Sequence, residues 1–128
     1  MNYYIFTAGI ISTFATIGHF TIGSKDFLKP VLNSEVGDIP KNVMMSLFHY
    51  MSGFMVLTSV ILLSISMGEP LIFQNTKDVV MLIVLFYGTF AIIQFTIALF
   101  SSITLGIIKL FQWIFWLLIA LFALIGAY

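Results

Sequence analysis

The chain has 128 residues, of which 61% are hydrophobic, 16% are aromatic and only 8% are charged. Soluble domains carry about 25% charged residues, so the composition excludes an ordinary soluble protein and predicts a chain that lies almost wholly in a lipid bilayer. The five lysines balance the five acidic residues and arginine is absent, which argues against nucleic acid as a partner. The absence of cysteine excludes disulfides, thiol chemistry and Cys-ligated metals.

Three apolar runs predict four membrane-spanning helices, because the last run, residues 79–128, is long enough to cross the membrane twice. A hydrocarbon layer of about 30 Å takes about 20 helical residues per crossing, so the chain is long enough for about four crossings. We therefore expect one all-α domain over residues 1–128, an integral membrane four-helix bundle with short connections and membrane lipid around it. The expected helices cover residues 3–23, 43–67, 79–100 and 104–127.

Charged and helix-breaking residues predict where the chain leaves the membrane. Residues 24–42 hold six of the ten charged residues together with two prolines, so we expect one longer charged loop between the first two helices. Gly68-Glu69-Pro70 predicts the end of the second helix, and residues 101–106 predict a reversal before the fourth.

The lysines predict the orientation in the membrane. Four of the five lie on the side of the long loop, namely Lys25, Lys29, Lys41 and Lys109, and only Lys77 lies opposite. Because positive residues are more frequent in cytoplasmic loops, we expect the long loop in the cytoplasm, with a bacterial inner membrane as the location.

The antiparallel order of the helices brings five polar residues to similar depth below the same surface. They are His19, His49, Gln94, Lys109 and Gln112. Polar side chains inside a membrane are costly unless they are paired, so we expect this polar layer to be a solute- or ligand-binding site. Since histidine changes its charge in the physiological pH range, the leading interpretation is small-solute or proton-linked transport. A bundle this small encloses little volume, which favours a homo-oligomer.

The histidine pair also supports a cofactor interpretation. A b-type haem needs two axial imidazoles, which His19 and His49 could supply from facing helices. Copper could use the same pair together with methionines such as Met44, Met45, Met51 or Met55. Catalytic zinc is not expected, because it requires at least a third protein ligand and neither cysteine nor a carboxylate accompanies the pair.

A structural interpretation stays open beside these two. His19 and His49 could donate to carbonyls or to serine and threonine hydroxyls, and the two glutamines could join helices by hydrogen bonds. Lys109 could extend its ammonium group to the membrane surface. The protein would then be a structural or assembly subunit of a membrane complex. Catalysis is not expected, because acidic residues occur only in predicted loops and no Ser-His-Asp arrangement can form inside the bilayer.

Two short motifs in the first half of the chain are Gly18-His19 followed by Gly23, and Phe48-His49-x-x-Ser52. In these motifs the chain resembles a group of small four-helix bacterial membrane proteins with no assigned activity. That group has a Gly-His pair in the first helix and an aromatic-His-x-x-Ser pattern in the second. The resemblance implies the four-helix membrane fold and the paired histidines, and it implies no chemistry.

Overall fold

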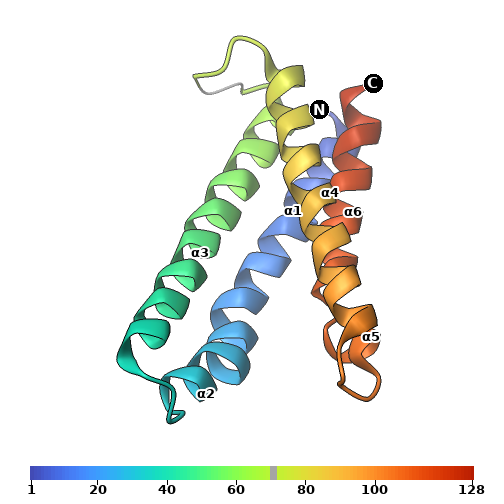
Figure 1. Cartoon of the computed structure of the whole chain (residues 1–128). Helices are drawn as coiled ribbons and strands as arrows, with labels where there is room; N and C mark the ends of the chain where they lie inside the picture. The colour runs from blue at the N-terminus through green and yellow to red at the C-terminus, as the bar shows by residue number, and fades with distance from the viewer. Residues whose placement is uncertain (70–71) are drawn as a thin grey trace.

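The computed structural model describes residues 1–69 and 72–128, and all the regular structure within them is helical (Figure 1). In chain order the elements are α1 (Tyr3–Gly18), the π-helix η1 (His19–Leu28), α2 (Lys29–Leu32), α3 (Asp38–Met67), α4 (Thr76–Phe100), α5 (Gly106–Lys109) and α6 (Gln112–Ala127). The predicted all-α class is confirmed. The segments long and apolar enough to cross a membrane are Tyr3–Leu32, Asp38–Met67 and Thr76–Phe100, and α6 is a shorter apolar helix.

The long helices lie side by side (Figure 1), and by their contacts α1 and α6 are the two that each pack against two others. α1 packs against α3 on one side and against α6 on the other, and α6 packs against α4. Both chain ends lie at one end of the molecule, the terminal end, while residues 33–37 and α5 lie at the opposite end, the loop end. α3 and α4 diverge toward the loop end and make little contact with each other.

Apolar side chains from all the long helices form one core. Its buried members are Ile5, Ala8, Met55, Leu62, Val80, Ile83, Tyr87, Ala91, Trp116, Ile119, Ala120 and Ala123. Alanines from three of the helices occur in this set, and such small residues let helix backbones approach closely. The core therefore combines large apolar side chains with close helix contacts.

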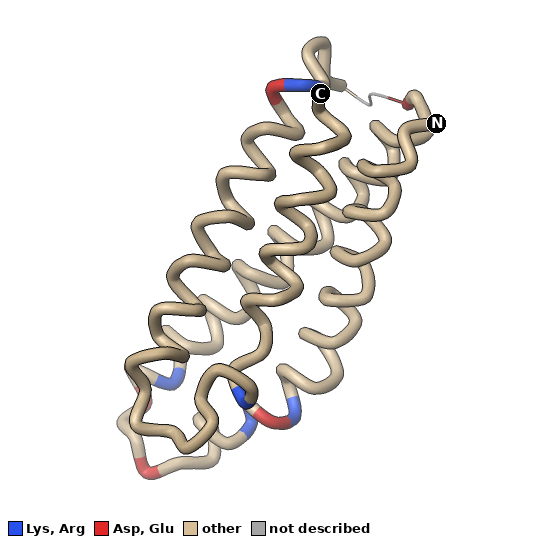
Figure 2. The backbone as a smooth tube through the Cα atoms, turned by 90° about the vertical axis from the view of Figure 1, so that its right-hand side faces the viewer, with Lys and Arg blue, Asp and Glu red and all other residues tan. Residues whose placement is uncertain are grey.

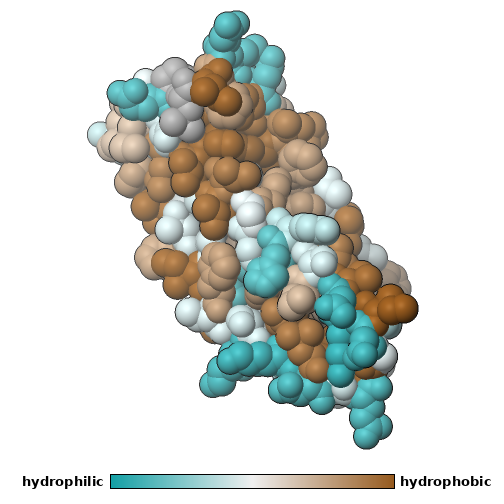
Figure 3. Space-filling view, turned by 90° about the vertical axis from the view of Figure 1, so that its left-hand side faces the viewer, coloured by the Kyte–Doolittle hydropathy of each residue, from teal (hydrophilic) through white to brown (hydrophobic). Residues whose placement is uncertain are grey.

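Charged residues lie only at the two ends of the molecule (Figure 2). Between these ends large apolar side chains are exposed on every long helix, for example Phe14, Leu57, Ile92 and Leu121. Figure 3, which shows the side where α3 lies, has hydrophilic side chains at both ends and apolar ones over much of the surface between them. The middle of the molecule is therefore apolar on its outside as well as in its core.

The first helical segment is longer than predicted, and the expected long loop is short. η1 and α2 continue α1 to Leu32, so only residues 33–37 separate the first two long segments. Pro30 lies at the junction of η1 and α2, and the helical segment continues through it to Leu32. α3 begins at Asp38, earlier than predicted, because an acidic residue and Pro40 are both favourable in a first turn.

The end of α3 agrees with the prediction. Gly68 has a φ of 89°, which favours glycine, and its N–H donates to the carbonyl of Ile65 at 3.1 Å. The N–H of Glu69 donates to the carbonyl of Ser64 at 2.9 Å. These two bonds form a Schellman motif, which satisfies the last carbonyls of the helix. Pro70, the third residue of the predicted stop, lies outside the described residues.

The last predicted helix, residues 104–127, is divided in the structure. The reversal after α4 is confirmed, but α5 forms a single turn there and the final helix begins only at Gln112. Leu105 has a φ of 60°, which turns the chain just before α5. The indole N–H of Trp113 donates to the carbonyl of Ile107 at 3.1 Å, so α5 is held against the start of α6.

Asn2 joins α1 to two other helices at the terminal end. Its Oδ1 accepts from the N–H of Ile5 at 3.1 Å, which caps α1, and its Nδ2 donates to the carbonyl of Gly126 at 2.7 Å. Its backbone N–H donates to the carbonyl of Ser66 at 2.8 Å. Gly126 permits this approach, because a Cβ atom there would lie only 2.9 Å from the backbone nitrogen of Ile5.

A cluster of buried hydroxyl groups joins α1, α3 and α4 near the middle of the molecule. Ser12 Oγ lies 2.8 Å from Ser59 Oγ and 3.0 Å from the hydroxyl of Tyr87, and that hydroxyl lies 2.7 Å from Thr58 Oγ1. All four side chains are buried. Because buried polar groups require partners, this hydroxyl cluster favours one register of the three helices.

We predict that Gly126→Ala lowers the free energy of unfolding by about 1–3 kcal/mol, since the added methyl group would meet the backbone of Ile5 and push α1 from α6. Thermal unfolding in detergent measures this change. Gly88→Ala is the matched control, because a Cβ atom there meets nothing within 4 Å, and it should unfold no earlier than the unmodified protein. Equal unfolding temperatures for both variants would contradict the close contact at Gly126.

We predict that Tyr87→Phe lowers the free energy of unfolding by about 1 kcal/mol, because the hydroxyl partners of Ser12 and Thr58 are lost while the ring remains. Denaturation in mixed micelles measures the difference. Tyr50→Phe is the control, since Tyr50 is exposed on α3, and it should leave stability unchanged. The importance of the hydroxyl cluster would be refuted by two variants of equal stability.

Candidate functional site

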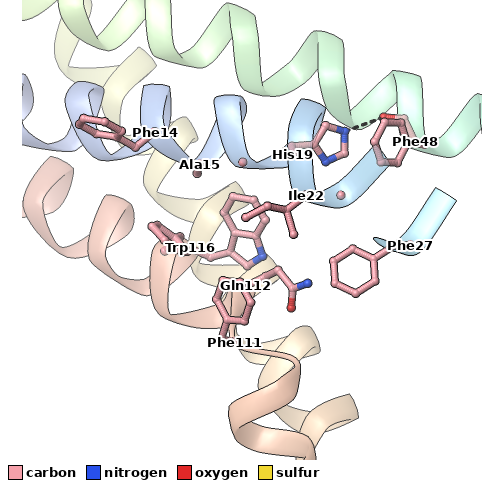
Figure 4. Close-up of a pocket in the computed structure, with 12 residues that line it drawn as sticks. Phe14, Ala15, His19, Ile22, Phe27, Phe48, Phe111, Gln112 and Trp116 are labelled. Atoms are coloured by element: carbon pink, nitrogen blue, oxygen red, sulfur yellow. Dashed lines mark hydrogen bonds between the residues drawn. The ribbon is translucent and has the colours of Figure 1, made fainter. Parts of the chain in front are cut away.

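A pocket of about 550 Å³ lies at the loop end, between α1 and η1 on one side and α6 on the other (Figure 4). The first segment lines it with Phe14, Gly18, His19, Ile22, Gly23 and Phe27. The other elements contribute Phe48, Phe111, Gln112, Phe115 and Trp116. The volume falls within the range of about 300–1,000 Å³ that is typical of sites for organic molecules.

Helical spacing explains why these side chains share one space. Phe14, Gly18 and Ile22 recur every four residues and therefore lie on one face of the first segment. The same spacing relates Phe111 to Phe115 at the start of α6. Since α1 packs against α6, Phe14 on one side and Phe111 and Phe115 on the other line the same pocket.

His19 is held in one orientation by groups on α3. Its Nε2 lies 2.9 Å from Ser52 Oγ and 3.2 Å from the carbonyl oxygen of Phe48. Its ring stacks on the ring of Phe48, with centroids 3.9 Å apart and planes inclined by 17°. The imidazole is therefore fixed between η1 and α3, and in Figure 4 its other ring nitrogen lies on the pocket side.

Gln112 begins α6 and lies on the opposite side of the pocket from His19 (Figure 4). Its Oε1 is buried and has no hydrogen-bond partner within residues 1–69 and 72–128. A buried polar atom without a partner costs about 1–3 kcal/mol. His19, Gln112 and the indole N–H of Trp116 are the polar side-chain groups of a lining that is otherwise apolar.

The polar pair lies slightly inside the charged loop end. His19 precedes Lys25 by six residues, and Gln112 follows Lys109 by three. Both residues are therefore close along the chain to lysines of the loop end. Trp116, one turn farther from the loop end, stacks at a tilt on Tyr87 with centroids 5.6 Å apart. The pocket therefore extends from the level of the charged end into the apolar middle.

The structure brings together two of the five residues predicted for the polar layer, His19 and Gln112. His49 is exposed on α3, where it meets the edge of Phe48, and it does not line the pocket. Gln94 is half-buried on α4 and Lys109 is exposed on α5, and neither lines the pocket. All five lie toward the loop end as expected, but the rotation of each helix separates their side chains.

The histidines do not form one ligand set in the described part of the chain. No ring contact or hydrogen bond joins His19 to His49 there, and Nε2 of His19 is engaged by α3. Residues 1–69 and 72–128 also contain no group of three or more histidine, aspartate or glutamate side chains that could hold a metal ion. Haem or copper binding by the pair stays a prediction that the pocket geometry does not favour.

The sequence interpretation missed the aromatic lining of the pocket. The signal was present in the four-residue spacing from Phe14 to Ile22 and from Phe111 to Phe115. Trp113 does not line the pocket, and its ring contacts Phe95 with centroids 5.1 Å apart.

Comparison of the chain with protein-family models, curated proteins and solved structures found no match. The resemblance to small four-helix bacterial membrane proteins therefore stays a prediction, and the function has to be inferred from the pocket itself.

Proposed function

We propose that this protein is an integral membrane protein that binds a lipophilic small molecule in the pocket of His19 and Gln112. The observation that carries the proposal is the chemistry of the lining. Aromatic side chains surround a space of about 550 Å³, and two hydrogen-bonding side chains lie across it. Sites for small organic molecules combine a mostly apolar wall with a few polar groups in this way.

The distribution of charge supports four membrane crossings. Charged side chains lie at the two ends, and the surface between them exposes large apolar side chains. α6 has 16 residues, about 24 Å at 1.5 Å per residue, and Ile107 and Ile108 of α5 precede it. We further propose that the loop end is cytoplasmic in a bacterial inner membrane, because it holds four of the five lysines.

The depth of the pocket supports an amphipathic ligand. Its polar groups lie near the charged loop end, where the head groups of lipids would be, while Phe14 and Trp116 lie deeper. The exposed side chains of Phe14, Ile22 and Phe27 border the pocket, so it is accessible from the apolar surroundings. A molecule dissolved in the bilayer would therefore reach the site without crossing water.

Proton-linked transport is a second candidate, favoured by the hydroxyl cluster. Thr16 Oγ1 lies 3.4 Å from Ser59 Oγ, so polar side chains follow the interface of α1 and α3 from the level of His19 to Tyr87. Proton flux into vesicles that is lost in Ser12→Ala would support this candidate. We give the pocket precedence because the hydroxyls of the cluster already satisfy one another.

The proposed topology predicts the labelling of single cysteines, which is unambiguous because the chain contains none. Gln74→Cys should react with a membrane-impermeant maleimide in intact cells, since residue 74 lies at the terminal end. Glu35→Cys should react only after permeabilisation. Labelling of both variants in intact cells would contradict the orientation, and recovery of the protein without membranes would contradict the crossings.

Gly18→Leu should fill the pocket without disrupting the fold. Gly18 lines the pocket, a Cβ atom there meets nothing within 4 Å, and leucine is the better helix former. We expect native mass spectrometry in mild detergent to detect a bound lipophilic molecule on the unmodified protein but not on this variant. Gly53→Leu is the matched control, since Gly53 is equally uncrowded but lies outside the pocket, and it should retain the molecule. Equal retention by both variants would contradict the proposed site.

A further inference from the structure

The partners of His19 on α3 determine which of its ring nitrogens carries the proton. The carbonyl oxygen of Phe48, 3.2 Å from Nε2, can only accept a hydrogen bond. The hydroxyl of Ser52 donates to that same carbonyl at 2.9 Å, so its oxygen is free to accept from Nε2 at 2.9 Å. Both contacts are satisfied when Nε2 carries the proton. In the neutral imidazole, Nδ1 is then an acceptor.

This acceptor faces the pocket. Figure 4 shows the second ring nitrogen of His19 on the side of Ile22 and away from α3. A Cβ atom at Gly23 would lie 3.6 Å from Nδ1, so the glycine keeps the space beside this nitrogen open. Within the described residues, the hydrogen bonds of the His19 ring are made by Nε2 alone. A bound molecule can therefore reach Nδ1 from the pocket.

Gln112 adds complementary groups on the facing wall. Its amide has both a donating NH₂ group and an accepting oxygen, and that oxygen is buried without a partner in the described part of the chain. The pocket thus offers Nδ1 of His19 as an acceptor, and it offers the NH₂ group of Gln112 and the indole N–H of Trp116 as donors. A hydroxyl group matches this set, because it donates one hydrogen bond and accepts others.

We propose that the ligand is a lipophilic alcohol or phenol whose hydroxyl donates a hydrogen bond to Nδ1 of His19. Its apolar body would lie along Phe14, Phe115 and Trp116. This inference rests on the proposed function, that the pocket binds a lipophilic molecule. Ethers, esters and ketones of the same shape are discriminated against, because they cannot donate to Nδ1 and would leave this acceptor buried without a partner.

A pair of brominated probes tests the proposal. The probes are 11-bromo-1-undecanol and its methyl ether, which share the apolar chain and differ in the hydroxyl hydrogen. The protein is reconstituted in lipid vesicles as Trp113→Phe, which leaves Trp116 of the pocket as the one tryptophan. Bromine quenches tryptophan fluorescence at close range, so quenching reports that the chain of the probe has entered the pocket.

We expect the alcohol to reach half-maximal quenching at an about 10-fold lower concentration in the membrane than the ether. His19→Phe keeps a ring that can stack on Phe48 but removes both nitrogens, so it should abolish the difference between the probes. Gly18→Leu should abolish quenching by both. If His19→Phe does not fold, the proposal is tested by the two probes alone: the alcohol must quench Trp116 of the otherwise unmodified pocket at a lower concentration than the ether.

The outcomes separate the two proposals. Equal quenching by alcohol and ether, blocked by Gly18→Leu, would overturn the hydroxyl assignment and leave the lipophilic pocket standing. A preference for the alcohol that persists in His19→Phe would also overturn the role of His19. Absence of quenching by either probe, or quenching that Gly18→Leu does not affect, would overturn the pocket itself and the inference with it.

Discussion

The high cost of an unpaired polar group in apolar surroundings governs how this chain packs. Apolar side chains cover the middle of the molecule outside as well as inside, so burial alone gives its helices little reason to prefer one another to lipid. Hydrogen bonds between polar groups of neighbouring helices determine which faces of the helices pack together. The hydroxyls of Ser12 and Tyr87 find side-chain partners on neighbouring helices only when α1, α3 and α4 are in register. Asn2, at the start of α1, likewise bonds to Ser66 of α3 and Gly126 of α6 only when these three helices are in register at the terminal end.

At the pocket, the protein leaves two polar atoms without a hydrogen-bond partner in the described residues. One nitrogen of His19 is paired with α3, while the other faces the pocket, and Oε1 of Gln112 is buried without a partner in the described residues. The π-helix η1 begins at His19, and π-helical turns frequently occur at functional sites. Binding is thus expected to gain free energy from a hydrogen bond to Nδ1 of His19 as well as from apolar contact.

Local signals in the sequence predicted the helices and several of their ends. Gly68 ends α3 in the left-handed conformation that glycine favours, and the chain reverses after α4 where serines and a glycine follow an apolar run. Residues 24–42 were misinterpreted because charged residues are as compatible with a helix that emerges from the apolar layer as with a loop. Pro30 is compatible with both a loop and a helix at this place, since proline is accepted in the first turn of a helix such as α2.

The site was predicted only in part. Chain order and helix length placed His19, His49 and Gln112 at similar depth, but His49 turned out to lie on an exposed face of α3. The helical class, the apolar runs and the charged ends could be predicted from the sequence, because they depend on the composition of short segments. Only the tertiary structure decided which face of each helix turns inward, because that rotation depends on how side chains from distant segments fit together.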